Sequence, residues 1–182
     1  IDAACSKPNR LIPSDHIYVM ACDPAFRHDA FGIAVGHKEG EMYVVDAVWN
    51  FKPTNTREVS PTEVKKFIFK LQETINIPIV VFDVPSYPEL IEELRNSGVE
   101  VKTHIVKKSD YDLLRELMYM KRVVLPDDET LRKELRQLQL VSPRKVDHPK
   151  GGSKDVADAV CNVLWALHQT SKTYPLNVVV VV

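Results

Sequence analysis

The chain has 182 residues, of which 45% are hydrophobic and 27% charged, as in a soluble globular protein of one domain. Its net charge of −1, from 24 basic and 25 acidic residues, argues against a generic nucleic-acid coat but leaves room for local basic patches. No apolar run approaches the ~20 residues that span a bilayer. The three cysteines are too widely spaced for a disulfide framework or a zinc motif.

The first part of the chain predicts three antiparallel strands. Residues 1–15 contain two prolines and little periodicity, so we expect a linker or arm there. Residues 17–22, 31–36 and 42–49 are short β-rich runs, and a Gly-containing turn joins the second run to the third. Because the chain begins at Ile1 without an initiator methionine or a secretory signal, we expect it to be a fragment or a processed chain.

The rest of the chain alternates strands with helices. Ser60, Pro61 and Glu63 have the spacing of a helix N-terminus, and apolar residues then recur at helical intervals. Further strands are expected at 79–82, 99–106 and 123–125, and further helices at 86–97, 110–120, 127–140 and 153–168. We expect a loop at 141–152. Residues 172–182 are expected to form a tail that either adds an edge strand or is a remnant of cloning.

This order of elements predicts an α/β fold with a mixed sheet, in which three antiparallel strands precede parallel βα units and helices cover the faces. No G-x-G-x-x-G follows the first strand, so a dinucleotide-binding fold is disfavoured. No G-x-x-x-x-G-K-[ST] occurs, so the chain lacks the motif that holds ATP in a P-loop.

Aspartates stand where such a fold places its functional site. Asp23 and Asp83 each end a predicted strand, and Asp155 and Asp158 lie on one face of the last helix. Clustered carboxylates repel one another unless a cation joins them, and hard oxygen ligands suit Mg²⁺ or Mn²⁺. Two such ions hydrolyse phosphodiesters without a nucleophilic side chain. Any one of these aspartates serves equally well as a turn former or helix cap, so their coincidence carries the inference.

Basic residues precede the acidic helix. The segment 142–154 has a local net charge of +3, which suits contact with a phosphate backbone and little base readout. The residues proposed for DNA contact are Arg144, Lys145, Lys150 and Lys154 in this segment, with Lys107, Lys108 and Arg122 as possible extensions of the track. Lys/Arg pairs like the latter are more often only solvated. His148 either contacts a phosphate or a water, or is merely solvated.

Four segments resemble the nuclease domain of bacteriophage large terminase subunits, and together they cover residues 16–170. They are ACDPAFRHDAFGIAVG, VVFDVPSYPELIEELRNSGVEV, MYMKRVVLPDDETLRKELRQLQLV and HPKGGSKDVADAVCNVLWAL. The resemblance implies a ribonuclease H-like nuclease domain over 16–171. It also implies metal-dependent cutting of concatemeric, double-stranded viral DNA, with little sequence specificity, during genome packaging in the cytoplasm of the infected bacterial cell.

The resemblance also assigns roles to the acids. It makes Asp23 the ligand shared by two Mg²⁺ or Mn²⁺ ions, Asp83 the second ligand and Asp158 the third, with Asp155 as a rival or accessory ligand. In this hypothesis Asp23 and Asp158 hold the ion that generates the nucleophile, and Asp23 and Asp83 hold the ion at the leaving 3′ oxygen. Asp29 either joins an outer shell or is a solvated turn residue.

The partners implied by the resemblance are double-stranded DNA, an N-terminal packaging ATPase domain in the full-length protein, a portal and a small terminase subunit, with no membrane. Since no Walker motif is present, the chain resembles the isolated nuclease domain. Two alternatives stay open. One is a junction-resolvase or transposase-like nuclease on the same fold. The other is a non-catalytic docking module of the packaging machinery or a flavodoxin-like binding domain.

Overall fold

The computed structural model describes residues 1–24, 30–52, 59–83 and 87–173, with residues 171–173 described by their backbone alone. Seven strands form one sheet in the order β1-β7-β4-β3-β2-β5-β6. These strands are β1 (Cys5–Pro8), β2 (Val19–Asp23), β3 (Phe31–Glu39), β4 (Met42–Phe51), β5 (Ile79–Phe82), β6 (Glu100–Thr103) and β7 (Val123–Asp127). The helices are α1 (Pro61–Thr74), α2 (Pro88–Asn96), α3 (Lys108–Tyr119), α4 (Glu129–Gln137) and α5 (Asp155–Thr173).

The predicted mixed sheet is confirmed. β3 pairs antiparallel with both β2 and β4, as the alternation of the first three strands indicates. β5 then lies parallel to β2, β6 parallel to β5, and β7 parallel to β4. Parallel neighbours need a crossover connection, and α1, α2 and α3 supply these connections.

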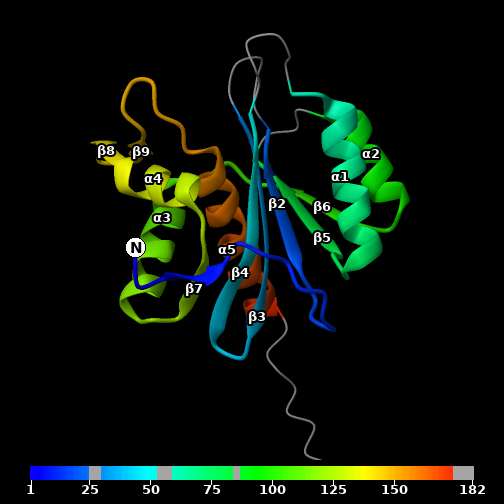
Figure 1. Ribbon diagram of the computed structural model, residues 1–182, viewed down its shortest axis with the longest axis horizontal. Coiled ribbons are helices and arrows are strands. Elements are labelled where there is room, and N and C mark those ends of the chain that lie inside the picture. The colour runs from blue at the N-terminus through cyan, green and yellow to red at the C-terminus, as the bar shows by residue number, and fades with distance from the viewer. Residues whose placement is uncertain (25–29, 53–58, 84–86, 174–182) are drawn as a thin grey trace, which may run out of the picture.

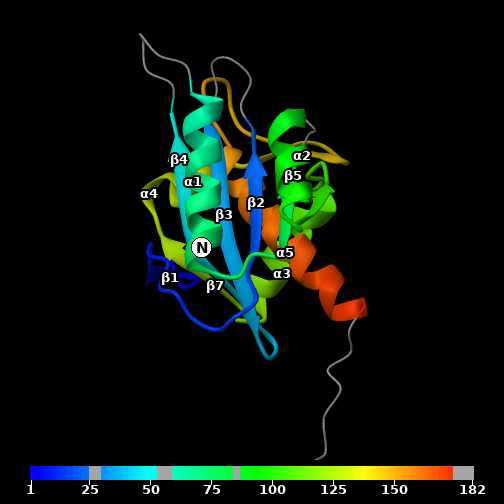
Figure 2. The ribbon, with the colours of Figure 1, turned by 90° about the vertical axis from the view of Figure 1, so that its right-hand side faces the viewer.

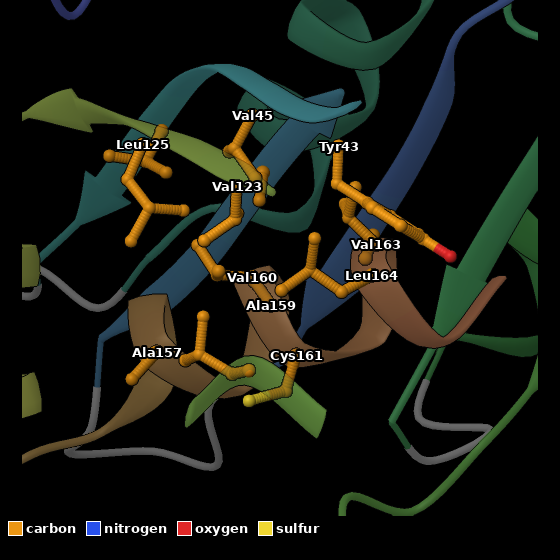
Figure 3. Close-up of a cluster of buried hydrophobic side chains, with 14 of the residues drawn as sticks. Tyr43, Val45, Val123, Leu125, Ala157, Ala159, Val160, Cys161, Val163 and Leu164 are labelled. Carbon is orange, nitrogen blue, oxygen red and sulfur yellow. The ribbon is translucent and has the colours of Figure 1, made fainter. Parts of the chain in front are cut away.

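Helices cover the two faces of the sheet separately (Figure 1). α1 and α2 pack on one face over a cluster that includes Ile68 and Leu94. α3, α4 and α5 cover the other face, which Figure 2 shows from the side. α5 runs along the middle of the sheet, and its Val160 and Leu164 lie with Val45 of β4 and Leu125 of β7 in a single buried cluster (Figure 3).

Glycine and alanine on β3 allow α5 to approach the sheet closely. Gly32, Ala34 and Gly36 alternate with Phe31, Ile33 and Val35, which belong to the opposite cluster. A Cβ atom on Gly36 would lie 2.9 Å from the Val163 side chain of α5 and 2.5 Å from the Val44 carbonyl oxygen. The helix therefore lies nearer to β3 than any larger side chain would permit.

Two expectations differ from the structure. Residues 1–15 were expected as linker or arm, but β1 pairs parallel with β7 at the sheet edge. Residues 141–152 were expected as a loop, but β8 (Gln139–Ser142) and β9 (Lys145–Asp147) form an antiparallel hairpin. The helix expected at 127–140 begins only at Glu129, because Asp127 belongs to β7 and the Asp128 carboxylate caps the helix.

Helix α5 is longer than the sequence indicates. It continues to Thr173, so it takes in the start of the expected tail, and residues 174–182 of that tail lie outside the described residues. Within the described ranges, no helix is both long and apolar enough to cross a membrane.

Candidate metal centre

Two aspartates lie side by side where β2 and β5 end. Cys22 of β2 is the register partner of Phe82 of β5, so Asp23 and Asp83 follow at the same level. The Asp83 N–H donates to the Cys22 carbonyl at 3.1 Å, which continues the parallel ladder to these residues. The carboxyl ends of neighbouring parallel strands thus bring together two acids that are 60 residues apart in the chain.

The alternation of each strand decides which face these acids occupy. Ala21 and Val81 belong to the cluster beneath α5, whereas Cys22 and Phe82 belong to the cluster beneath α1 and α2. Since side chains alternate between faces, Asp23 is on the α5 side, and Asp83 continues β5 on that side too. The two acids therefore face the helix that carries the other two.

The N-terminus of α5 rests against the strand beside Asp23. Gly32 is the cross-strand partner of Asp23, and a Cβ atom on Gly32 would lie 2.3 Å from the Asp155 carbonyl oxygen. Only a residue without a side chain permits this approach. Asp155 and Asp158, one turn apart on α5, are thereby placed at the same end of the sheet as Asp23 and Asp83.

The Asp158 carboxylate is held from two sides. Its side chain is only 4% exposed. It accepts a hydrogen bond from the Tyr111 hydroxyl of α3 at one oxygen and forms an ion pair with Lys154 at the other. Burial raises the pKa of Tyr111 well above its ordinary range, so the hydroxyl keeps its proton and remains a donor. Asp158 is thus fixed in orientation, facing its acidic neighbours.

The four acids form one electrostatic unit. Burial, followed by repulsion from Asp158, Asp155 and Asp83, raises the pKa of Asp23 from 3.8 to about 9, and Lys154 opposes the rise. Burial also raises the pKa of Asp158, although its contacts with Lys154 and Tyr111 lower it. Without a cation the cluster carries more negative charge than its surroundings neutralise, which is the condition that a divalent ion relieves.

Asp83 is positioned by the segment between β6 and α3. Its Oδ1 accepts a hydrogen bond of 2.9 Å from the Val106 N–H. Lys107 comes next and stands at the N-cap of α3, where its N–H donates to Asp110 at 2.7 Å. The Lys107 backbone therefore lies next to the anchor of Asp83, as a track beside the acids requires.

Glu134 is a site residue that the sequence argument missed. It is 2% exposed, and its Oε2 accepts from the Ala157 N–H of α5 at 2.8 Å. The Ser153 hydroxyl lies 2.8 Å from both Glu134 and Asp155. A signal was available, because Glu134 falls on the apolar stripe of its helix between Leu131 and Leu138, where a carboxylate needs a partner.

A pocket of about 500 Å³ opens beside Asp155. Its lining includes the lysines Lys52 and Lys133, neither of which was predicted as a site residue. The side-chain amide of Asn50 also lines it, and its buried nitrogen and oxygen have no hydrogen-bond partner within the described part of the chain. Cations and an unsatisfied amide beside the acids suit a phosphate-bearing ligand.

The predicted DNA-contact residues are divided by their positions. Arg144 and Lys145 lie on the β8–β9 hairpin, where Lys145 pairs with Asp147, and Lys150 is exposed in the loop that follows. Lys154 is engaged by Asp158 within the acidic cluster. The remaining placements concern Lys108, paired with Asp112; Arg122, paired with Glu41; His148, whose Nδ1 donates to the Pro149 carbonyl; and Asp29, which lies outside the described residues.

Arg122 does not fit the predicted track. It contacts Glu41 at the β3–β4 turn, where Glu39 pairs with Met42. Asp23 pairs with Gly32 at the other end of β3. The length of the sheet therefore separates Arg122 from the acids, because the strand that it precedes runs parallel to β4 from the turn end.

Three solved structures show which fold this is. The large terminase nuclease of the thermophilic phage G20c matches with a TM-score of 0.67 and 18% identity, over 91% of this chain and 94% of that one. The same nuclease with bound magnesium gives 0.69 and 17%, over 90% and 93%. The HK97 bacteriophage large terminase gives 0.71 and 15%, over 90% of this chain and 42% of that chain.

Sequence comparison alone does not reach this result. No family model matches the chain, and neither does any curated protein. The likeness to solved structures rests instead on the arrangement of the mixed sheet and its helices. The chain has the ribonuclease H-like fold of phage large terminase nuclease domains, as its sequence segments suggest.

Proposed function

We propose that this chain is a metal-dependent endonuclease that cuts double-stranded, concatemeric viral DNA with little sequence specificity while a genome is packaged. The observation that carries the proposal is the meeting of Asp23, Asp83, Asp155 and Asp158 at one end of the sheet, on the face covered by α5. The fold of phage terminase nucleases supports it, and the setting would be the cytoplasm of an infected bacterium.

The residues at this site fit divalent cations of the magnesium class. All four are carboxylates, the ligands that Mg²⁺ and Mn²⁺ prefer, and the raised pKa of Asp23 reflects charge that a cation would neutralise. The G20c nuclease has been solved with bound magnesium and with bound cobalt. In our proposal Asp23, Asp83 and Asp158 hold two ions, and Asp155 is a further ligand or the rival of Asp158.

When bound, such ions supply an activated water and stabilise the leaving 3′ oxygen of the phosphodiester. The chain's own residues hold the ligands in place. Tyr111 orients the Asp158 carboxylate, and the Val106 N–H orients that of Asp83. Lys154 neutralises Asp158 in the absence of other cations, and its ammonium would contact a phosphate once that charge is compensated.

DNA would be held through its phosphates. Arg144 and Lys150 project from the segment that leads into α5, and Lys52 and Lys133 line the pocket beside Asp155. Backbone contacts of this kind bring salt dependence and little sequence preference. The lysines of the pocket extend the predicted track on the side that the sequence did not indicate.

The packaging context rests on the solved relatives. This chain spans 42% of the HK97 large terminase. It spans the same share, 42%, of the large terminase of another thermophilic bacteriophage, which was solved in complex with ATP-γ-S. We infer that this chain works beside an N-terminal packaging ATPase domain, and that a portal and a small terminase subunit are its further partners.

The test is cleavage of supercoiled plasmid by the purified chain with Mg²⁺, Mn²⁺ or EDTA. We expect cutting with either metal, none with EDTA, and a loss of at least ~10³-fold in Asp23→Asn, because the ligand shared by both ions is removed. Asp15→Asn is the matched control, since Asp15 is exposed and precedes β2. Undiminished cutting by Asp23→Asn would contradict the proposal. A strong preference for branched over linear duplex would favour the resolvase alternative.

A further inference from the structure

Three side chains with metal-binding atoms meet at the end of the sheet opposite to the acids. His16 precedes β2, and His37 and Glu39 lie on the last part of β3. One nitrogen from each histidine and one oxygen of Glu39 all lie within 4.8 Å of one another. The register separates this group from the nuclease site, because Glu39 pairs with Met42 at the turn while Gly32 pairs with Asp23.

The distances within the group match a coordination shell. Glu39 Oε1 is 3.2 Å from His37 Nε2 and 3.3 Å from His16 Nε2. In a tetrahedral site with ligand bonds of about 2.0–2.1 Å, two ligand atoms are about 3.3 Å apart. Two of the three ligand atoms are thus already spaced from Glu39 as a bound ion of the zinc class requires.

His37 is oriented as a metal-binding histidine usually is. Its side chain is 4% exposed, and its Nδ1 lies 2.6 Å from Asp46 Oδ2, which directs Nε2 toward Glu39. Asp46 is skipped in the β3–β4 register at a bulge, and bulges re-aim side chains. Its other oxygen pairs with Lys7. A carboxylate behind a histidine fixes the tautomer and strengthens the nitrogen as a ligand.

His16 is the adjustable member of the group. Its ring stacks on that of His37, with centroids 4.0 Å apart and planes 13° from parallel. The lone pairs of parallel rings do not converge, so one ring must turn for both nitrogens to reach one ion. His37 is buried and held by Asp46, whereas His16 is 41% exposed and Glu39 is 57% exposed. Hence His16 turns, and solvent reaches a fourth ligand position.

We propose that His16, His37 and Glu39 bind one transition-metal ion of the zinc class, which fastens the segment before β2 to the end of β3. Two imidazoles and one carboxylate suit Zn²⁺ and Co²⁺, and they do not suit Mg²⁺, which prefers oxygen ligands. The site is independent of the proposed nuclease activity, because it shares no residue with the acidic cluster. Its role is structural, since it joins two segments that are distant in the sequence.

The test is a Co²⁺ titration at pH 8, followed by visible absorption, with excess Mg²⁺ present to occupy the acidic cluster. Hydrogen bonds from Asp46 and Glu39 raise the pKa of His37 despite its burial, so alkaline pH limits competition by protons. We expect one Co²⁺ per chain with the intense bands of a low-coordinate site, displaced by equimolar Zn²⁺. His16→Gln and Glu39→Gln should each weaken binding at least ~10-fold.

Two controls separate this site from the other candidates. Glu41→Gln changes an exposed glutamate two residues from Glu39 and should leave Co²⁺ binding intact. Asp23→Asn should also leave it intact. Zn²⁺ should raise the Tm of the unaltered chain and of both controls, but not that of Glu39→Gln. Absence of Co²⁺ binding, or binding that survives in His16→Gln and Glu39→Gln, would overturn the proposal.

Discussion

The Tyr111 hydroxyl is the contact that fixes the Asp158 carboxylate, since the other contact, Lys154, is a flexible cation. We expect Tyr111→Phe to raise the Mg²⁺ concentration for half-maximal cutting about 10-fold, the size of effect found when partners of metal ligands are removed. The rate at saturating Mg²⁺ should fall much less. The measurement is plasmid cutting across a Mg²⁺ series, which separates metal affinity from the rate.

Tyr119→Phe is the matched control for this prediction, because Tyr119 ends the same helix and is 82% exposed. It should leave the Mg²⁺ dependence unchanged. A Tyr111→Phe variant that needs no more Mg²⁺ than the control would mean that Asp158 keeps its position without the hydroxyl, or that it does not bind the ion.

The aspartates could be predicted individually, but their supporting residues could not. Asp23 and Asp83 each follow a recognisable strand, and the ends of neighbouring parallel strands meet by the geometry of the sheet. Tyr111 reaches Asp158 across 47 positions of sequence. That contact depends on how α3 packs on α5, which no local pattern encodes. Whether Asp155 or Asp158 is the main ligand therefore stays a prediction.

The position of α5 depends on the small residues of β3. We expect Gly32→Ala to weaken Mg²⁺ binding and to destabilise the fold by about 1–3 kcal/mol, because its Cβ would overlap the Asp155 carbonyl and push the helix start away from Asp23. Mg²⁺-dependent cutting and urea denaturation measure the two effects. Gly36→Ala is the comparison, since its Cβ would meet Val44 and Val163 instead.

The two glycine variants distinguish crowding from site disruption. Both should lower the free energy of unfolding. Only Gly32→Ala should raise the Mg²⁺ concentration needed for cutting, because Gly36 lies further along β3, away from the residue that pairs with Asp23. Equal Mg²⁺ requirements in the two variants would show that the start of α5 accommodates the extra methyl group.

The hairpin β8–β9 and the loop after it supply the DNA contacts in our proposal. Arg144 and Lys150 are the cations of this segment with no ion pair to any other described residue, whereas Lys145 and Lys154 are paired. We expect a double variant, Arg144→Ala with Lys150→Ala, to weaken duplex binding and to reduce the salt slope of the affinity by about 1–2. Fluorescence anisotropy with a labelled duplex at several salt concentrations measures both.

A control for charge alone is available on the opposite face. Lys66 and Lys70 are exposed on α1, which covers the side of the sheet away from the acids. The double variant Lys66→Ala with Lys70→Ala should keep the original salt slope. If both double variants lose affinity equally, the net charge of the chain governs binding, and the hairpin makes no specific contact.

The strands that were not predicted share a physical reason. β8 is exposed along its whole length, so its sequence shows no alternation between apolar and polar residues. β1 has four residues and ends at Pro8, which reads as a breaker, yet Pro is tolerated at a sheet edge. β2, β3 and β4 were predicted because they are buried and rich in apolar side chains that favour strands.

The acidic cluster makes the stability of the metal-free protein depend on pH. In the folded chain the pKa of Asp23 is about 9, against 3.8 for an ordinary aspartate. Between these values the folded state holds a proton that the unfolded state has lost. The free energy of unfolding therefore falls as pH rises toward 9, and the contribution of Asp23 is complete only below about pH 4. The raised pKa values of Asp158 and Glu134 act in the same direction.

Bound Mg²⁺ should reverse this trend, since ionised carboxylates bind the ion and protonated ones do not. We expect the metal-free chain to be less stable at pH 8 than at pH 6, and Mg²⁺ at about 100 times its Kd to restore about 2.7 kcal/mol at pH 8. Asp23→Asn should flatten the pH dependence and abolish most of the Mg²⁺ effect, while being more stable than the unaltered metal-free chain at pH 8. Urea denaturation at both pH values, with Mg²⁺ or EDTA, measures each difference. A metal-free chain that gains stability from pH 6 to pH 8 would show that the four carboxylates do not share one buried site.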